Sequence, residues 1–299
     1  MKTKFKSSLR IACHSFGGVV CAGAVILIIS NARAQNLFVS DIGPCKVYEF
    51  TPGGTQSTFA SGFSVPYGLA FDSAGNLFVS DYNYGNGIIC EYTPGGTRST
   101  FASGFSRPTG LAFNSAGKLF AADWASGNIY EIKADGTRST FASGLNWPTC
   151  LAFDSAGNLF EADESSGNIY KFTPGGTQST FASGLIRPYG LAFNSAGNLF
   201  VSDLLGGNIY EYTPGGTRST FASGLSEPSG LAFDNADNLF VSGLISGSIY
   251  EYTPGGTQTV FVSGLQYPTY LAFQPVPEPS ALGLLTVCTT ALLVLRRRN

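Results

Sequence analysis

The residue types that most often do chemistry are scarce in this chain, and histidine is the clearest case. His14 is the one histidine among 299 residues, and it lies in an N-terminal stretch with the features of a secretory signal. The rest of the chain has no imidazole to act as a general base, to join a Ser-His-Asp or Cys-His set, or to bind zinc. This excludes histidine-dependent hydrolysis and favours a protein that is not an enzyme.

Carboxylates are the next candidates, and most of them repeat. An aspartate ends one short apolar run in five of six repeats, namely Asp41, Asp81, Asp123, Asp163 and Asp203, and Gly243 takes its place in the sixth. Copies so alike predict a structural role, in which each carboxylate accepts a hydrogen bond from the loop that follows it.

One acidic cluster departs from the repeat. It consists of Glu161, Asp163 and Glu164. Carboxylate oxygens are the ligands that calcium prefers, so these three side chains are the candidate metal ligands, beside the alternative of a structural role. The sequence firmly implies no cofactor.

The six cysteines divide between the ends and the middle of the chain. Cys13, Cys21 and Cys288 lie near the ends, which leaves Cys45, Cys90 and Cys150. A disulfide is plausible in an exported protein, and Cys45 and Cys90 fall in neighbouring repeats, so they are the predicted pair. Cys150 replaces a glycine of the repeat and is expected to be unpaired.

The elements that must position these residues follow from an internal repeat. The triplet Leu-Ala-Phe starts at Leu69, Leu111, Leu151, Leu191, Leu231 and Leu271, with spacings of 42, 40, 40, 40 and 40 residues. A period near 40 built from short β-like runs is typical of propeller blades. With 38 glycines and only 12% charged residues, the composition is that of a turn-rich all-β protein.

Each repeat contains four short runs, which we call A to D. In one repeat they are Gly190–Phe193, Asn198–Asp203, Ile209–Tyr212 and Thr217–Gly224, separated by turn signals such as Ser-Ala-Gly and Pro-Gly-Gly. The first complete run of the repeat region is B and the last is A. We therefore expect a six-bladed β-propeller with four-stranded antiparallel blades, closed by pairing the last A with the first B, C and D.

The repeats resemble NHL repeats and the related six-bladed gluconolactonase-like propellers. The matching residues are Pro188-Tyr-Gly-Leu-Ala-Phe, Gly197-Asn-Leu-Phe-Val-Ser-Asp203 and Asn208-Ile-Tyr-Glu-Tyr212. In gluconolactonase-like enzymes this resemblance implies a divalent cation held by Glu, Asn and Asp side chains, with the Asn after the proline between runs D and A. Here that position is Tyr, Thr or Ser, so the ligand set does not carry over. Similarity to streptogramin lyases would require a catalytic histidine, which is missing.

The two ends carry targeting features. Lys2, Lys4, Lys6 and Arg10 precede an apolar stretch, and Ala32-Arg33-Ala34 gives a small-x-small cleavage pattern, so residues 1–34 are predicted to be a signal peptide, with an uncleaved anchor as the alternative. Residues 275–299 resemble a PEP-CTERM sorting signal, with Pro277, Glu278 and Pro279, a short apolar run and Arg296-Arg297-Arg298.

This resemblance implies a transient membrane anchor, processing by an exosortase after signal peptidase, and delivery to the cell surface or extracellular matrix. A tail anchor that stays in place is the alternative. The propeller is then residues 35–274. Between Gln35 and Val276 the chain has 18 acidic and 9 basic residues, a net charge of −9, which gives no electrostatic basis for binding nucleic acid.

The loops between runs B and C and between runs D and A should share one face and are the parts that vary between repeats. Variation on one face of a repeated scaffold is typical of a binding surface, with relaxed selection on loops as the alternative. The six residues after the D–A prolines, Tyr67, Thr109, Thr149, Tyr189, Ser229 and Thr269, all carry hydroxyls and are expected at the channel mouth. The candidate ligand-binding residues are Tyr67, Tyr82, Tyr84, Arg107, Trp124, Trp147, Arg187, Tyr189 and Tyr267.

Two functions remain open at this point, beside a purely structural role as a spacer without a ligand. The favoured one is a non-catalytic binding propeller for an extracellular polysaccharide or a surface protein. The alternative is a metal-dependent lactonase or hydrolase of the gluconolactonase-like group. Converging carboxylates and amides at the channel mouth would favour the enzyme, whereas hydroxyls and aromatic rings would favour the binding protein.

Overall fold

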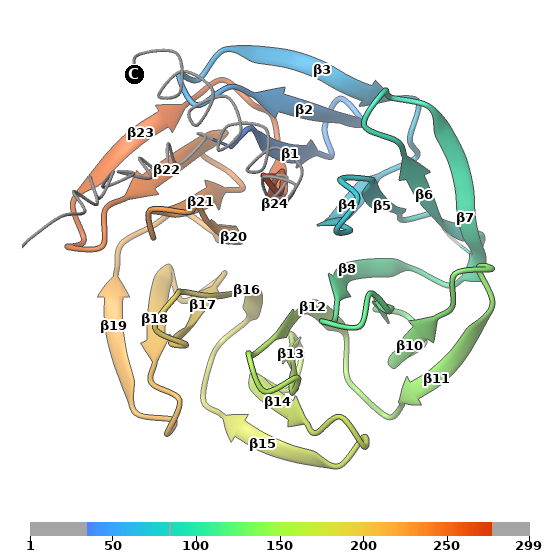
Figure 1. The fold of residues 1–299 in the computed structure, drawn as a ribbon. Coiled ribbons are helices and arrows are strands. Elements are labelled where there is room, and N and C mark those ends of the chain that lie inside the picture. Colours follow the sequence, from blue (N-terminus) through green and yellow to red (C-terminus); the bar gives the residue numbers. More distant parts are fainter. Residues whose placement is uncertain (1–34, 84, 277–299) are drawn as a thin grey trace, which may run out of the picture. The chain divides into compact units, whose positions relative to one another are not determined.

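Twenty-four strands form six four-stranded antiparallel sheets arranged as the blades of a propeller (Figure 1). The computed structural model describes residues 35–83 and 85–276. The predicted signal peptide, the motif Pro277, Glu278 and Pro279, and Tyr84 lie outside the described residues. The all-β, six-bladed prediction is confirmed.

The blades are numbered along the chain, each from its innermost strand outward. Blade 1 is β24 (Pro268–Phe273), β1 (Leu37–Asp41), β2 (Lys46–Phe50) and β3 (Gln56–Ser61); blade 2 is β4 (Pro66–Phe71), β5 (Leu77–Asp81), β6 (Gly87–Tyr92) and β7 (Arg98–Phe105); blade 3 is β8 (Pro108–Phe113), β9 (Leu119–Asp123), β10 (Asn128–Ile132) and β11 (Arg138–Ala142). Blade 4 is β12 (Pro148–Phe153), β13 (Leu159–Asp163), β14 (Asn168–Phe172) and β15 (Gln178–Ala182); blade 5 is β16 (Pro188–Phe193), β17 (Leu199–Asp203), β18 (Asn208–Tyr212) and β19 (Arg218–Ala222); blade 6 is β20 (Pro228–Phe233), β21 (Leu239–Gly243), β22 (Ser248–Tyr252) and β23 (Gln258–Val262).

The ring closes through blade 1, as the order of the runs predicts. Strand β24, from the end of the repeat region, pairs antiparallel with β1, with Leu271 opposite Val39 and Phe273 opposite Leu37. The three-plus-one closure is therefore confirmed. It pairs one edge of β1 that would otherwise expose unsatisfied backbone groups.

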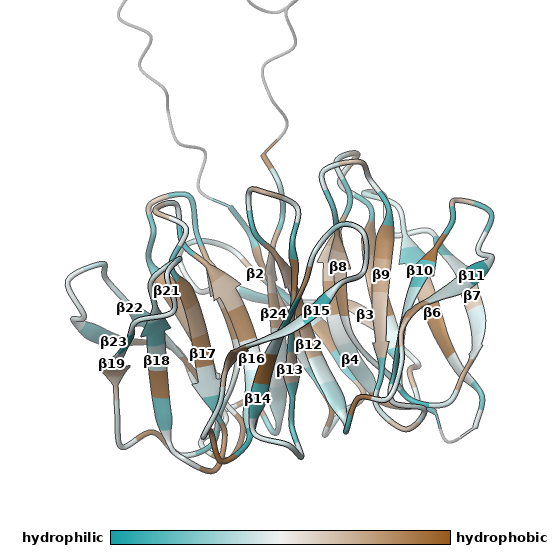
Figure 2. Ribbon diagram, turned by 90° about the horizontal axis from the view of Figure 1, so that it is seen from below, coloured by the Kyte–Doolittle hydropathy of each residue, from teal (hydrophilic) through white to brown (hydrophobic). Residues whose placement is uncertain are grey.

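Phenylalanines hold neighbouring blades together. Phe78 of β5 meets Phe101 of β7 and Phe113 of β8 edge to face, with ring centroids 4.9 and 5.0 Å apart. Aromatic pairs favour this edge-to-face geometry, and the same arrangement recurs between other blades. Figure 2 shows hydrophobic residues concentrated in strands such as β9 and β17, with hydrophilic residues in the connecting turns along the upper edge of the view.

The connections fall on two faces. We call the face with the B–C and D–A connections the loop face, and the face with the A–B and C–D connections the turn face. On the turn face, Asp72 accepts hydrogen bonds from the backbone N–H groups of Ala74 and Asn76, and Gly75 takes a positive φ of 83° that favours glycine. Across the described ranges, no helix is long and apolar enough to cross a membrane.

Candidate functional site

The repeated aspartate that ends the second strand in five of the six blades anchors the loop face. Asp123 accepts hydrogen bonds from the backbone N–H groups of Ser106 (2.8 Å) and Arg107 (2.7 Å), in the loop that enters its own blade. Asp41, Asp81 and Asp203 bind the equivalent amides in their blades. The predicted structural role is confirmed, but the main target is the preceding D–A loop, whereas we expected the following B–C loop.

A second backbone contact places the two variable loops side by side. The N–H of Trp124, directly after β9, donates to the carbonyl of Arg107 at 2.9 Å. The N–H of Tyr82 donates in the same way to Val65, and that of Glu164 to Trp147. A residue that varies in the B–C loop therefore always meets one that varies in the D–A loop.

These contacts assemble a continuous chain of rings on the loop face, which we call the aromatic chain. Tyr67 stacks on Tyr82 with ring centroids 5.2 Å apart and planes inclined by 23°. The guanidinium of Arg107 lies over both Tyr82 (5.4 Å) and Trp124 (5.2 Å). Trp124 in turn stacks on Trp147, at 4.7 Å and 22°. Stacking and cation–π contacts thus link blades 2, 3 and 4.

Glu164 fixes the orientation of this chain. Its carboxylate accepts a hydrogen bond from the indole Nε1 of Trp124 at 3.0 Å and forms an ion pair with Arg187. The Glu164 side chain is 3% exposed, whereas that of Arg187 is 39% exposed. A buried carboxylate requires partners of this kind, and Glu164 finds both of them on neighbouring blades.

Trp147 is held in a strained backbone conformation. Its φ is 67°, in the left-handed region that bulky side chains rarely adopt, and its side chain is 42% exposed. Strain of this kind persists where the surroundings over-determine it, and such positions cluster in functional sites. The stack with Trp124 holds an exposed indole in place on the loop face.

Tyrosines close the centre of the propeller at this end. Tyr270 crosses the axis from blade 1, and its hydroxyl donates to the carbonyl of Thr149 in blade 4 at 2.6 Å. The Tyr67 and Tyr189 rings each lie 5.9 Å from it. Burial raises the pKa of Tyr189 and of Tyr270 well above the usual value, so both phenols remain neutral.

The hydroxyls expected at the channel mouth are mostly internal. Thr109, Thr149, Ser229 and Thr269 are each about 1% exposed or less. Thr109 donates to the carbonyl of Pro148 in the next blade (2.9 Å), and Ser229 to that of Pro268 (3.1 Å). The prediction that these small side chains lie at the channel mouth is wrong, because they are buried and form hydrogen bonds between the innermost strands of adjacent blades.

The acidic cluster does not converge on one point. Asp163 accepts hydrogen bonds from the backbone N–H groups of Asn146 and Ser166, and Glu164 accepts one from the indole of Trp124. Glu161 is fully buried in β13, and neither of its carboxylate oxygens has a hydrogen-bond partner. In the described part of the chain no group of three or more His, Cys, Asp or Glu side chains is arranged to hold a metal ion. The residues predicted as calcium ligands therefore do not fit a metal site.

The predicted disulfide is absent. Cys45 and Cys90 are both free thiols: Cys45 donates to the carbonyl of Ser64 at 3.1 Å, and the guanidinium of Arg98 donates to the Cys90 sulfur at 3.2 Å. Cys150 is also free, and burial raises its pKa to about 12. Cys90 lies inside its sheet and Cys45 in a loop, a difference that sequence spacing does not show.

Of the nine predicted ligand-binding residues, the structure joins seven. Tyr67, Tyr82, Arg107, Trp124 and Trp147 form the aromatic chain, and Arg187 is tied to it through Glu164, whose part in the site the sequence reasoning missed. Tyr189 is buried at the axis and is joined to Tyr67 through the ring of Tyr270. Tyr267 is 46% exposed but lies apart, in the loop before β24. The exposed apolar residues in the other loops of this face are Ile186, Leu205, Ile245 and Tyr267, and we call them the apolar rim.

The fold is that of known six-bladed propellers. A chain from the crystal structure of a nidogen/laminin complex is similar with a TM-score of 0.73 and 20% identity, over 82% of this chain and 99% of that chain. A putative gluconolactonase is similar with a TM-score of 0.65 and 19% identity (78% and 89% covered), and virginiamycin B lyase from Staphylococcus aureus with 0.60 and 14% (77% and 85%).

At these identities the likeness establishes the fold alone. The sequence matches no protein-family model and no curated protein. The chain is a six-bladed β-propeller whose structural neighbours include NHL-type and gluconolactonase-like propellers. Because this fold supports many functions, the function must be argued from the site.

Proposed function

We propose that this chain is a non-catalytic binding propeller that takes an extracellular polysaccharide or a surface protein on its loop face. The observation that carries the proposal is the aromatic chain from Tyr67 to Trp147. Rigid rings provide a large contact area at low cost in conformational entropy, and arginine and tryptophan are the residues that dominate binding energy in known interfaces.

The arrangement suits a ligand with both apolar and polar surfaces. The exposed face of Trp147 offers an apolar platform, whereas the partly exposed guanidinium of Arg187 adds a positive charge on the same face. The neighbouring apolar rim extends the same surface over blades 5 and 6 for a larger ligand. Hydroxyl-bearing rings at the axis, in place of converging carboxylates and amides, favour binding over metal-dependent hydrolysis.

The test removes the rings and keeps the scaffold. The triple variant Tyr82→Ala, Trp124→Ala and Trp147→Ala is expected to bind polysaccharides on a glycan array, or partners in a pull-down, at least about tenfold more weakly. The control variant Val260→Ala changes an exposed apolar residue of the outermost strand β23, outside both the aromatic chain and the apolar rim, and should retain binding. Unchanged binding by the triple variant, with its thermal transition intact, would refute the proposal.

The alternative of a metal-dependent lactonase is supported by similarity of fold alone. Of the candidate ligands, Asp163 is used by backbone amides and Glu164 by Trp124 and Arg187, whereas Glu161 is buried in β13 without a partner. A bound divalent ion in the purified protein, together with turnover of a lactone, would establish the alternative and displace the binding proposal.

Export belongs to the same proposal. The basic start of the chain, Ala32-Arg33-Ala34 and the motif Pro277, Glu278 and Pro279 support signal peptidase cleavage, exosortase processing and a cell-surface location. Mass spectrometry of the chain recovered from cells is expected to find Gln35 as the first residue. A recovered chain that still carries residues 1–34 would contradict this.

A further inference from the structure

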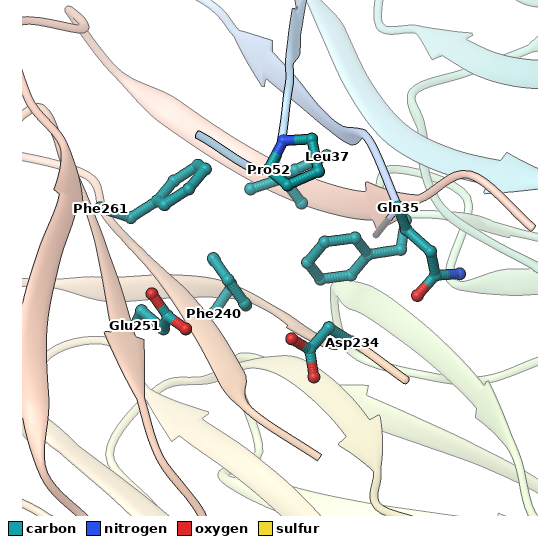
Figure 3. A pocket seen from close by; sticks show the side chains of 8 residues that line it. Gln35, Leu37, Pro52, Asp234, Phe240, Glu251 and Phe261 are labelled. Atoms are coloured by element: carbon teal, nitrogen blue, oxygen red, sulfur yellow. The ribbon is translucent and has the colours of Figure 1, made fainter. Parts of the chain in front are cut away.

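Two pockets on the turn face occupy equivalent places in different blades. One, of about 510 Å³, lies between blades 2 and 3, and the other, of about 110 Å³, lies between blades 6 and 1 (Figure 3). Five lining positions are the same in both. They are Asp72, Phe78, Glu91, Phe101 and Phe113 in the first pocket, and Asp234, Phe240, Glu251, Phe261 and Phe273 in the second.

Each pocket combines three aromatic walls with two carboxylates. Phe240 meets Phe261 and Phe273 edge to face at 5.1 and 5.0 Å. Figure 3 shows Asp234 and Glu251 on one side of the pocket, with Pro52 and Leu37 on the other. Burial and the nearby Asp234 raise the pKa of Glu251, as expected for two acidic groups that share a partly buried site without a cation.

In three other blades, the glutamate equivalent to Glu91 and Glu251 has a donor from its own blade. The donor is the residue that precedes the second strand. The pairs are Asn36 with Glu49 (2.7 Å), Lys118 with Glu131 (2.8 Å) and Asn198 with Glu211 (2.7 Å).

Blades 2 and 6 lack this donor because of one local change. Asn76 and Asn238 turn their amides to the aspartates of the adjacent turn, Asp72 (2.8 Å) and Asp234 (2.9 Å). Among the described residues, neither the carboxylate of Glu91 nor that of Glu251 then has a hydrogen bond or an ion pair, although Ser73, Asn114 and Ser115 also line the first pocket and Gln35 the second. Both pockets described above lie at these two blades.

In blade 4 the equivalent position carries a cation from the chain itself. Lysine replaces the glutamate there, and the Lys171 ammonium lies 5.1 Å from the Phe160 ring centroid and 3.8 Å from the Asp154 carboxylate. Phe160 and Asp154 are the equivalents of Phe78 and Asp72. Phe160 also meets its two phenylalanine neighbours edge to face at 5.0 and 5.1 Å. The same pocket architecture thus binds an alkylammonium group within this chain.

We propose that the pockets of blades 2 and 6 are binding sites for an alkylammonium group presented by a lysine side chain of a partner protein. Each would take the place that Lys171 fills in blade 4, with the ammonium between the two carboxylates and over the central phenylalanine. Cation–π attraction and two nearby negative charges recognise such a group together. These sites lie on the face opposite the aromatic chain and do not depend on its ligand.

The experiment exchanges glutamate and lysine at the position that Glu91, Lys171 and Glu251 share in their blades, so each new residue already occurs at that position in another blade. The full chain is titrated with Nα-acetyl-lysine methylamide, and the backbone amides of residues 72–76, 154–158 and 234–238 are followed by NMR. The wild type is expected to respond at 72–76 and 234–238 only. Glu91→Lys should abolish the first response and Glu251→Lys the second, each weakening its own site by at least about tenfold, while Lys171→Glu should create a response at 154–158.

Each variant reproduces a pocket found elsewhere in the propeller, so folding is expected to be retained. Equal responses to the norleucine analogue, which lacks the charge, would overturn the proposal, as would an unaltered response in Glu91→Lys and Glu251→Lys. Tighter binding of 1,5-diaminopentane than of the blocked lysine would overturn the assignment to a lysine side chain, because a free diamine would then be the preferred ligand.

Discussion

At the scale of single residues, Glu161 shows how one substitution in a repeat creates a special environment. Valine occupies the equivalent position in four blades and Ala121 does so in blade 3. Glu161 is 0% exposed, and neither of its oxygens has a hydrogen-bond partner. Burial, and to a lesser extent Asp163, raise the pKa of Glu161 well above its usual 4.5, so the folded state retains its proton.

The raised pKa of Glu161 determines whether folding stability rises or falls with pH. Between the pKa of the unfolded chain near 4.5 and the higher pKa of the folded chain, the folded state binds more protons, so stability falls as pH rises through that window. Glu161→Val should raise the free energy of unfolding by about 1–3 kcal/mol and remove this decline. Urea denaturation of wild type and variant at several pH values measures both effects.

Glu161→Gln separates the cost of burying an unpaired polar group from the effect of its titration. The amide keeps a buried polar group without partners but cannot titrate, so it should remove the pH dependence without the full gain in stability. If wild-type stability rose between pH 5 and pH 8 relative to both variants, a raised pKa for Glu161 would be contradicted.

At the scale of elements, the unit that builds the loop face is a strand end together with the loop that it anchors. Asp123 ends β9 and holds the amides of Ser106 and Arg107. Asp123→Ala leaves these two amides without their acceptor, which should cost about 1–3 kcal/mol and loosen the loop beneath the aromatic chain. Hydrogen exchange of the Arg107 amide should become faster in the variant.

A matched control lies on the opposite face of the same blade. Asp135 is a fully exposed turn residue whose carboxylate bonds Thr137, and Asp135→Ala should leave the exchange of the Arg107 amide unchanged. An equal acceleration in both variants would show general destabilisation of blade 3 and would contradict a specific anchoring role for Asp123.

The repetition of this strand-and-loop unit explains which parts of the fold and the site could be predicted from the sequence. The fold, the closure and the variable face follow from the period and the order of the runs, because each blade repeats one hydrogen-bonding pattern. Contacts between side chains of different blades do not follow. Glu164 looked like a metal ligand because its partners Trp124 and Arg187 lie 40 and 23 residues away.

The direction of the hydroxyls was wrong for a related reason. At the position after the proline, the short side chains of Thr109 and Thr149 reach backbone carbonyls of the next blade, whereas the ring of Tyr189 lies at the axis against Tyr270. The length of the side chain therefore separates two environments that share one strand position. The sequence gives the position of each hydroxyl but not the neighbouring atoms that it reaches.

At the scale of the whole propeller, closure through β24 is what joins the two ends of the repeat region. Leu271 packs in one core cluster with Leu37 and Val39 of β1, together with Phe240 of blade 6. Burial of Leu271 and Tyr270 contributes roughly 1.5–3 kcal/mol each, before the backbone hydrogen bonds to β1 are counted. Domains of this kind are typically stable by only about 5–15 kcal/mol.

Removing β24 should therefore abolish the cooperative fold. A chain that ends at Gly264 loses the strand that covers β1 and leaves the innermost position of blade 1 empty, so we expect the sharp thermal transition of the full chain to be replaced by a broad one with aggregation. Adding a peptide of residues 265–276 should restore the sharp transition, since β24 binds through contacts that need no covalent link to β23. A truncated chain that melts as sharply and at the same temperature as the full chain would contradict the role of β24 in closing the propeller.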